Sequence, residues 1–244
     1  MHRNLEYRLS LESKKNKLTR EAHILIEGGR LEEARDVIQR LPNHKRKAKK
    51  LFYQALDLHT GSKGKVDFAE SKHLFFESDR LGAPLATMWL ARCYYRGLHA
   101  RMNGCQVDVK RGEEWAMIAI EEVKKLAKKG DSNAAFLLGA AYEDGLAIKK
   151  DLKQAFTWYE KGAKKENLMA LYALGQMYDS GHVGVKDHRQ ALKLFRLAAK
   201  RGHAGAMLIL ALKFEKGLGV PRDQKRADYW YNRAEQRGLR GSLR

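Results

Sequence analysis

The residues best placed to do chemistry are cations that recur in pairs. Such pairs bind phosphates and carboxylates, because ammonium and guanidinium groups donate hydrogen bonds to anionic oxygens. If the segments that carry them stack, the pairs align into one basic ridge. The helix dipole offers a simpler explanation, since cations are favoured at the C-termini of helices. The pairs stand 36 residues apart and are Lys128 and Lys129, Lys164 and Lys165, and Lys200 and Arg201.

Catalytic motifs are missing from the sequence. The nine histidines lie singly without an HExxH pair, the cysteines form no CxxC, and neither a GxGxxG nor a Walker loop occurs. We therefore expect no enzyme activity, no catalytic residue, no metal site and no cofactor.

A fixed period of 36 residues organises residues 131–238. Such a period is typical of a solenoid, in which each unit buries its apolar face against its neighbours. Within each unit, small and apolar residues at helical spacing lead to a glycine that ends a first helix, and an aspartate then caps a second helix. Each unit is therefore predicted to be a helical hairpin. The recurring positions are Gly145, Gly181 and Gly217; Asp151, Asp187 and Asp223; Ala155, Ala191 and Ala227; and Tyr142, Tyr178 and Phe214.

One unit carries a family resemblance. The string ALYALGQMYDSG from Ala170 to Gly181, followed by Asp187, Ala191 and Phe195, resembles the Sel-1-like repeat, a branch of the tetratricopeptide superfamily. The resemblance implies an all-α fold, a right-handed α–α superhelix that serves as an adaptor and usually has no catalysis of its own. The departures are mild: Glu166 replaces the terminal glycine, Ala211 replaces the glycine of the first helix, and Ala147 stands where valine is usual.

The chain is expected to contain about five such repeats behind an N-terminal tetratricopeptide-like hairpin. Unit 83–130 is 48 residues long instead of 36, and its 12 extra residues belong within 98–112. They form either a projecting functional loop or a surface loop with a longer second helix that starts near Asp108. The predicted segments are an extension 1–18, a capping hairpin 19–43 and a solenoid 44–244, with units 47–82, 83–130, 131–166, 167–202 and 203–238.

Charge and cysteine content bear on the partner and the compartment. Lysine and arginine number 48 against 29 acidic residues, which gives a formal charge of +19 and favours acidic or phosphate-rich partners. No apolar run is long enough to span a membrane, and no secretory signal is recognisable. Cys93 is expected to be a packing residue and Cys105 to lie in a loop, without a disulfide framework. We expect a cytoplasmic protein, with a mitochondrial or other intracellular location as the alternative.

A partner-binding groove is predicted on the first helices of the hairpins. The consensus residues face the core, so positions two residues further along should face outward in two adjacent columns. Packing between repeats is the alternative for Phe136 and Leu208. The predicted groove residues are Met88, Arg92, Arg96, Phe136, Tyr172, Gln176 and Leu208.

Two functions fit these features. The leading hypothesis is a non-enzymatic adaptor that binds a protein or peptide partner in the groove of the superhelix. The alternative is a basic protein that binds RNA or DNA phosphates, such as a subunit of a ribonucleoprotein. Phosphate binding should weaken steeply as salt rises, whereas binding in an apolar groove should not. The sequence does not indicate the oligomeric state.

Overall fold

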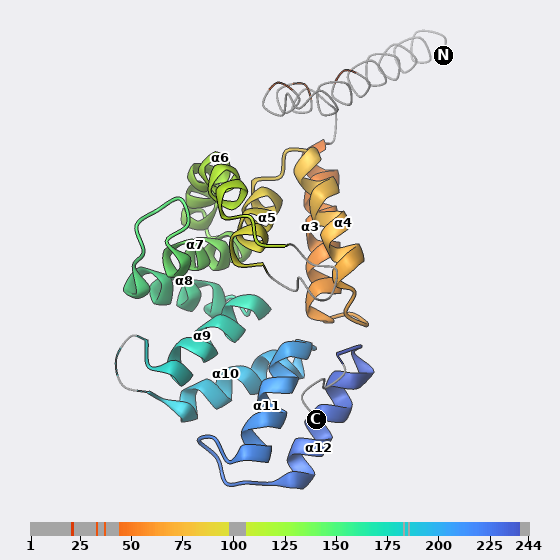
Figure 1. The fold of residues 1–244 in the computed structure, drawn as a ribbon, viewed down its shortest axis with the longest axis vertical. Helices are drawn as coiled ribbons and strands as arrows, with labels where there is room; N and C mark the ends of the chain where they lie inside the picture. The colour runs from red at the N-terminus through yellow and green to blue at the C-terminus, as the bar shows by residue number, and fades with distance from the viewer. Residues whose placement is uncertain are drawn as a thin grey trace, which may run out of the picture.

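The computed structural model describes residues 44–97, 106–182, 184 and 186–239, together with Glu21, Glu33 and Val37. The predicted extension 1–18 and capping hairpin 19–43 otherwise lie outside the described residues, so the division into segments stays a prediction. Ten helices lie in the described part, and each packs against the next in chain order, which confirms the all-α solenoid (Figure 1). They are α3 (His44–Thr60), α4 (Phe68–Arg80), α5 (Pro84–Arg96), α6 (Val109–Lys128), α7 (Ser132–Asp144), α8 (Leu152–Lys164), α9 (Leu168–Ser180), α10 (His188–Lys200), α11 (Ala204–Lys216) and α12 (Gln224–Gln236).

The hairpins begin and end where the repeated residues predict. Helix α7 ends at Gly145, whose φ of 76° is a left-handed conformation that costs glycine little. Helix α8 begins after Asp151, whose carboxylate accepts hydrogen bonds from the backbone N–H groups of Lys153 and Gln154. The same pair of signals recurs around α9 to α12. Local sequence therefore sets the hairpin boundaries.

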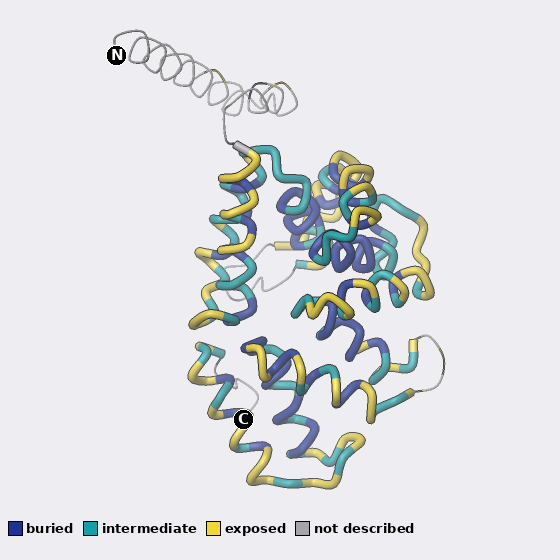
Figure 2. Tube along the Cα trace, turned by 180° about the vertical axis from the view of Figure 1, so that it is seen from behind, coloured by how far each residue is buried: buried dark blue, intermediate teal, exposed yellow. Residues whose placement is uncertain are grey.

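Most of the core lies on the first helix of each hairpin. Nine residues of α7 are buried but only three of α8, because α7 lies between α8 and the neighbouring hairpins (Figure 2). Close contact within a hairpin depends on glycine. A Cβ atom on Gly139 would lie 2.7 Å from the Tyr159 ring, and one on Gly175 would lie 2.8 Å from the Phe195 ring. In these two hairpins the aromatic ring of the second helix thus packs directly on the backbone of the first.

The enlarged unit has a lengthened second helix. Helix α6 contains 20 residues, against 13 in α8, α10 and α12, and it begins after Asp108, which caps it by accepting a hydrogen bond from the Arg111 N–H. Its additional turns lie against α5, where a Cβ atom on Gly112 would be 2.8 Å from the carbonyl oxygen of Ala91. The expectation of a longer helix starting near Asp108 is confirmed. Residues 98–105 of the connecting segment lie outside the described residues.

The first and last described hairpins contact each other. The backbone N–H of Val66, in the α3–α4 turn, donates to the Arg237 carbonyl at 2.8 Å. The Arg237 guanidinium donates to the carbonyls of Gly61 and Ser62 at 2.5 and 3.1 Å. Gly202 permits this approach, because a Cβ atom there would lie 2.7 Å from the Ser62 oxygen. The superhelix therefore closes on itself, with the turn below α3 and α4 beside the end of α12 (Figure 1).

Replacing Arg237 with alanine should open this closure. Hydrogen bonds from a charged group contribute about 1.5–3 kcal/mol each, and the substitution removes the only side chain shown to donate across the junction in the described part of the chain. We expect a longer distance between dyes attached at Lys65 and Gln236, measured by energy transfer. Arg233→Ala is the matched control, because Arg233 donates to Tyr229 within α12. An unchanged distance in Arg237→Ala would contradict this role of the guanidinium.

Candidate functional site

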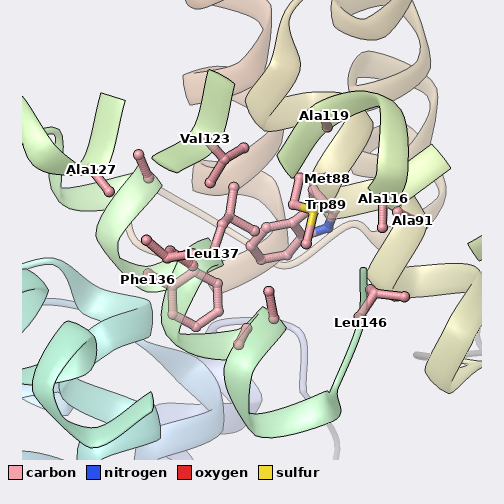
Figure 3. Packing of buried hydrophobic residues seen from close by; sticks show 14 of the residues in the cluster. Met88, Trp89, Ala91, Ala116, Ala119, Val123, Ala127, Phe136, Leu137 and Leu146 are labelled. Carbon is pink, nitrogen blue, oxygen red and sulfur yellow. The ribbon is translucent and has the colours of Figure 1, made fainter. Parts of the chain in front are cut away.

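Two residues of the predicted groove are buried instead of facing outward. Met88 is 1% exposed and Phe136 is 2% exposed, and both lie among the packed side chains of α5, α6 and α7 (Figure 3). The Phe136 ring stacks on Tyr159 with 5.9 Å between the ring centroids. The expectation of exposed side chains here is wrong, because a first helix meets neighbours on most of its sides. For Phe136, the alternative of packing between repeats is the one that the structure supports.

The two predicted groove arginines form an ionic network. Arg92 Nε lies 2.8 Å from Asp144 Oδ2, and Arg96 Nε lies 2.9 Å from Asp144 Oδ1. The Asp144 side chain is 1% exposed, whereas that of Arg96 is 43% exposed. Burial lowers the pKa of Arg92, but the nearby Tyr159, Asp144 and Glu143 outweigh it and leave that pKa raised. Arg92 is therefore held as a buried cation, and only Arg96 is accessible to a partner.

The remaining groove residues leave a small exposed area. The Tyr172 ring is half-buried and stacks on His203 with 4.7 Å between the ring centroids. Gln176 is exposed, and its amide donates to the Tyr172 hydroxyl at 3.3 Å. Leu208 is half-buried and packs against two apolar clusters. These positions do not form a continuous apolar groove with Met88 and Phe136.

All six residues of the predicted basic ridge are exposed at the ends of α6, α8 and α10. They differ in their partners. Arg201 forms an ion pair with Glu166 at 2.6 Å, and Lys165 Nζ donates to the Gly130 carbonyl at 2.6 Å. Lys128, Lys129, Lys164 and Lys200 form no ion pair within the described part of the chain. The unneutralised charge is therefore greatest at the ends of α6 and α8.

A cavity gathers part of this ridge. Its volume is about 440 Å³. Trp158 lies in its wall, and Lys161 Nζ stands 3.9 Å from the centre of that ring. No carboxylate appears among the described residues that line it, so the cavity is suited to an anion. We call it the Trp158 pocket; it is lined by Ala127, Lys128, Gly130, Ser132, Ala135, Trp158, Lys161, Lys164 and Lys165.

Sequence reasoning missed two of these residues. Lys161 and Trp158 are three residues apart on α8, so they share one face of the helix. This spacing was a usable signal. The sequence gives no signal that α8 lies close to the end of α6, because this contact depends on how neighbouring hairpins stack.

A larger cavity lacks the same charge imbalance. It measures about 650 Å³ and lies between α3, the α4–α5 turn and α6. Lys45 and Lys49 line it, but so do Glu122 and Asp131. Its charges therefore balance, and it offers no comparable preference for an anion.

The described residues also bear on metal binding, membrane insertion and disulfide bonding. Within the described residues, no group of three or more histidine, cysteine or acidic side chains is placed to hold a metal. None of the described helices combines the length and apolar character needed to cross a bilayer. Cys93 is buried, as expected of a packing residue, but it is also disulfide-bonded, which was not predicted from the sequence. Cys93 precedes the enlarged connection to α6, which contains the only other cysteine of the sequence, Cys105, outside the described residues.

Solved structures similar to this chain include three bacterial proteins. A Sel1 repeat protein from Oxalobacter formigenes is 29% identical, with 48% of this chain and 88% of that chain covered and a TM-score of 0.46. The c5321 protein, a protective antigen of uropathogenic Escherichia coli with an SLR fold, is 22% identical and has a TM-score of 0.49. The match covers 79% of this chain and 46% of that chain. A Sel1 repeat protein from Klebsiella pneumoniae is 20% identical and has a TM-score of 0.46. The match covers 78% of this chain and 87% of that chain. This chain thus spans less than half of the Escherichia coli protein.

No curated protein shows significant sequence similarity to the chain. The Sel1 repeat family model matches residues 84–121, 132–167, 168–203 and 204–239, which together make up more than half of the sequence. The match begins at α5 and extends through α12. Sel1 repeats generally form non-catalytic scaffolds for protein interactions. The described helices have the hairpin order of this family, and the chain belongs to the Sel1 repeat family.

Proposed function

We propose that this protein is a non-catalytic scaffold that holds an acidic protein partner against its basic ridge. The observation that supports this most is the exposed row of cations at the ends of α6 and α8, where Lys128, Lys129 and Lys164 form no ion pair within the described residues and no carboxylate lines the Trp158 pocket. The predicted groove offers less, because Met88, Phe136 and Arg92 are committed to packing and to an internal ion pair.

The electrostatics of the whole chain support the same proposal. With a formal charge of +19, the protein attracts acidic surfaces from beyond contact distance. Exposed ion pairs each contribute little, so several must act together to give useful affinity. A ridge that runs across successive hairpins can supply them. A location in the cytoplasm stays a prediction, and the disulfide at Cys93 removes one argument for it.

A charge-reversal comparison tests the proposal. The ridge variant is Lys128→Glu, Lys164→Glu and Lys165→Glu. The matched control is Lys153→Glu, Lys193→Glu and Lys225→Glu, three exposed lysines on α8, α10 and α12 that line neither cavity. Both variants change the net charge equally. We expect the wild type and the control to retain the same protein from a native extract after nuclease treatment, and the ridge variant to lose it.

Two results would contradict the scaffold proposal. One is retention that disappears on nuclease treatment, which would favour the nucleic-acid alternative. The other is equal loss in the ridge and control variants, since this would show that only the total charge matters. Salt titration separates the cases further, because phosphate binding falls with a slope set by the number of phosphates neutralised.

A further inference from the structure

The Trp158 pocket contains two lysines that the fold holds in place. The Lys161 ammonium lies over the Trp158 ring at 3.9 Å, a cation–π distance. Lys165 Nζ is held by its hydrogen bond to the Gly130 carbonyl. A free lysine loses side-chain entropy when it binds an anion, and a side chain that is already fixed loses less. The pocket is therefore preorganised in part.

The other lining groups complete an anion site with an apolar floor. Lys128 and Lys164 are exposed and end helices from two successive hairpins. Ala127, Ala135 and the Trp158 ring supply apolar surface between them. The helix dipole accounts for one cation at each helix end, but not for four lysines that line one pocket without a lining carboxylate among the described residues.

From this arrangement we propose that the Trp158 pocket anchors the acidic partner by taking an aspartate or glutamate side chain. This inference rests on the proposed function and assigns it a specific subsite. The carboxylate accepts from Lys161 and Lys164, while the methylene groups of the partner's side chain lie against Trp158. The apolar floor favours a peptide over a nucleic-acid backbone, because a phosphodiester brings no aliphatic side chain to cover it.

The test uses a defined probe, a fluorescent peptide of alternating glutamate and glycine. Binding is measured by anisotropy for the full chain at low and moderate salt. We expect Lys161→Gln with Lys164→Gln to weaken binding about tenfold, since each exposed ion pair contributes up to about 1 kcal/mol. The matched control, Lys153→Gln with Lys193→Gln, removes the same charge from α8 and α10 and should change the dissociation constant less than about twofold. A glutamine–glycine peptide should not bind.

Trp158→Leu separates the pocket from the ridge. It keeps an apolar side chain but removes the ring under Lys161, and thermal unfolding reports whether the fold is retained. We expect about threefold weaker peptide binding, because Lys161 is no longer fixed before the peptide binds and the methylene groups of the peptide lose the ring surface. If neither this variant nor the Lys161 and Lys164 double variant changes binding while the ridge charge reversal abolishes it, the pocket proposal is overturned and the scaffold proposal stands.

Two further outcomes would overturn the pocket proposal. If no variant affects the peptide, both proposals fail. If a homopolymeric RNA of equal charge binds more tightly than the peptide and loses affinity in the Lys161 and Lys164 variant, the pocket is a phosphate site and the peptide assignment is overturned.

Discussion

Replacing Asp144 with alanine should lower the free energy of unfolding by about 3–5 kcal/mol, because it leaves a buried guanidinium without its main partner. The Arg92 side chain is 12% exposed, and its Nε lies 2.8 Å from Asp144 Oδ2. Its second carboxylate neighbour, Glu143, is 3.8 Å away and accepts a hydrogen bond from the Tyr159 hydroxyl at 2.6 Å. Glu143 is therefore farther from Arg92 and shared with Tyr159, so it compensates the guanidinium less than Asp144 does. Chemical denaturation followed by circular dichroism measures the change.

A second substitution should restore much of this stability. Arg92→Met removes the orphaned charge, so the double variant with Asp144→Leu should be clearly more stable than Asp144→Ala. Arg96 tolerates the change because its side chain is 43% exposed and can turn toward water. The matched control is Glu121→Ala, which removes an exposed ion pair with Lys124 and should cost less than about 1 kcal/mol. Equal losses in Asp144→Ala and Glu121→Ala would show that Arg92 does not depend on its ion pair.

The sequence predicts local structure in this family well, and for a physical reason. A glycine at a left-handed φ and an aspartate at an N-cap act through their own backbone neighbours, so Gly145 and Asp151 mark the ends of helices wherever they occur. A constant spacing then transfers each assignment to the next unit. The same reasoning offered a lengthened helix behind Asp108 as one of two alternatives, and the structure shows that helix.

The expected exposure of Met88 and Phe136 was wrong, because the first helix of a hairpin has several neighbours. Phe136 is buried because its ring meets Tyr159 of α8 and Trp89 of α5 at once, and helix periodicity alone does not predict such contacts with two helices. The contacts at Arg237 depend on superhelical curvature, which accumulates from small rotations in every repeat. The prediction of the basic ridge required only that its residues lie at helix ends and are exposed. All six residues are exposed.

Between pH 7 and pH 5, His203 should make the protein less stable by about 2 kcal/mol. Burial lowers the pKa of this imidazole from its usual 6.5 to about 4. In the unfolded chain the ring binds a proton below pH 6.5, whereas in the folded chain it stays neutral until about pH 4. Stability is therefore complete above pH 6.5 and is lost as the pH falls toward 4. Denaturation curves across this range measure the loss.

The structure explains why this ring stays neutral. Its Nδ1 accepts a hydrogen bond from the Ala206 N–H at 3.1 Å and so caps α11, a role that requires an unprotonated nitrogen. Its Nε2 is buried without a hydrogen-bond partner in the described part of the chain. A proton on Nδ1 would therefore break the cap and place a charge where no described group compensates it.

The repeat supplies the control for this prediction. Asn167 stands 36 residues before His203 and caps α9 by accepting from the Ala170 N–H. His203→Asn should therefore keep a capped helix while it removes the titrating group. At pH 7 the variant is less stable than the wild type by the contribution of the stacking on Tyr172. Between pH 7 and pH 5, however, its free energy of unfolding should fall by about 2 kcal/mol less than that of the wild type. Parallel pH dependence in the two proteins would mean that another group governs the acid sensitivity, because every other titrating residue is common to both.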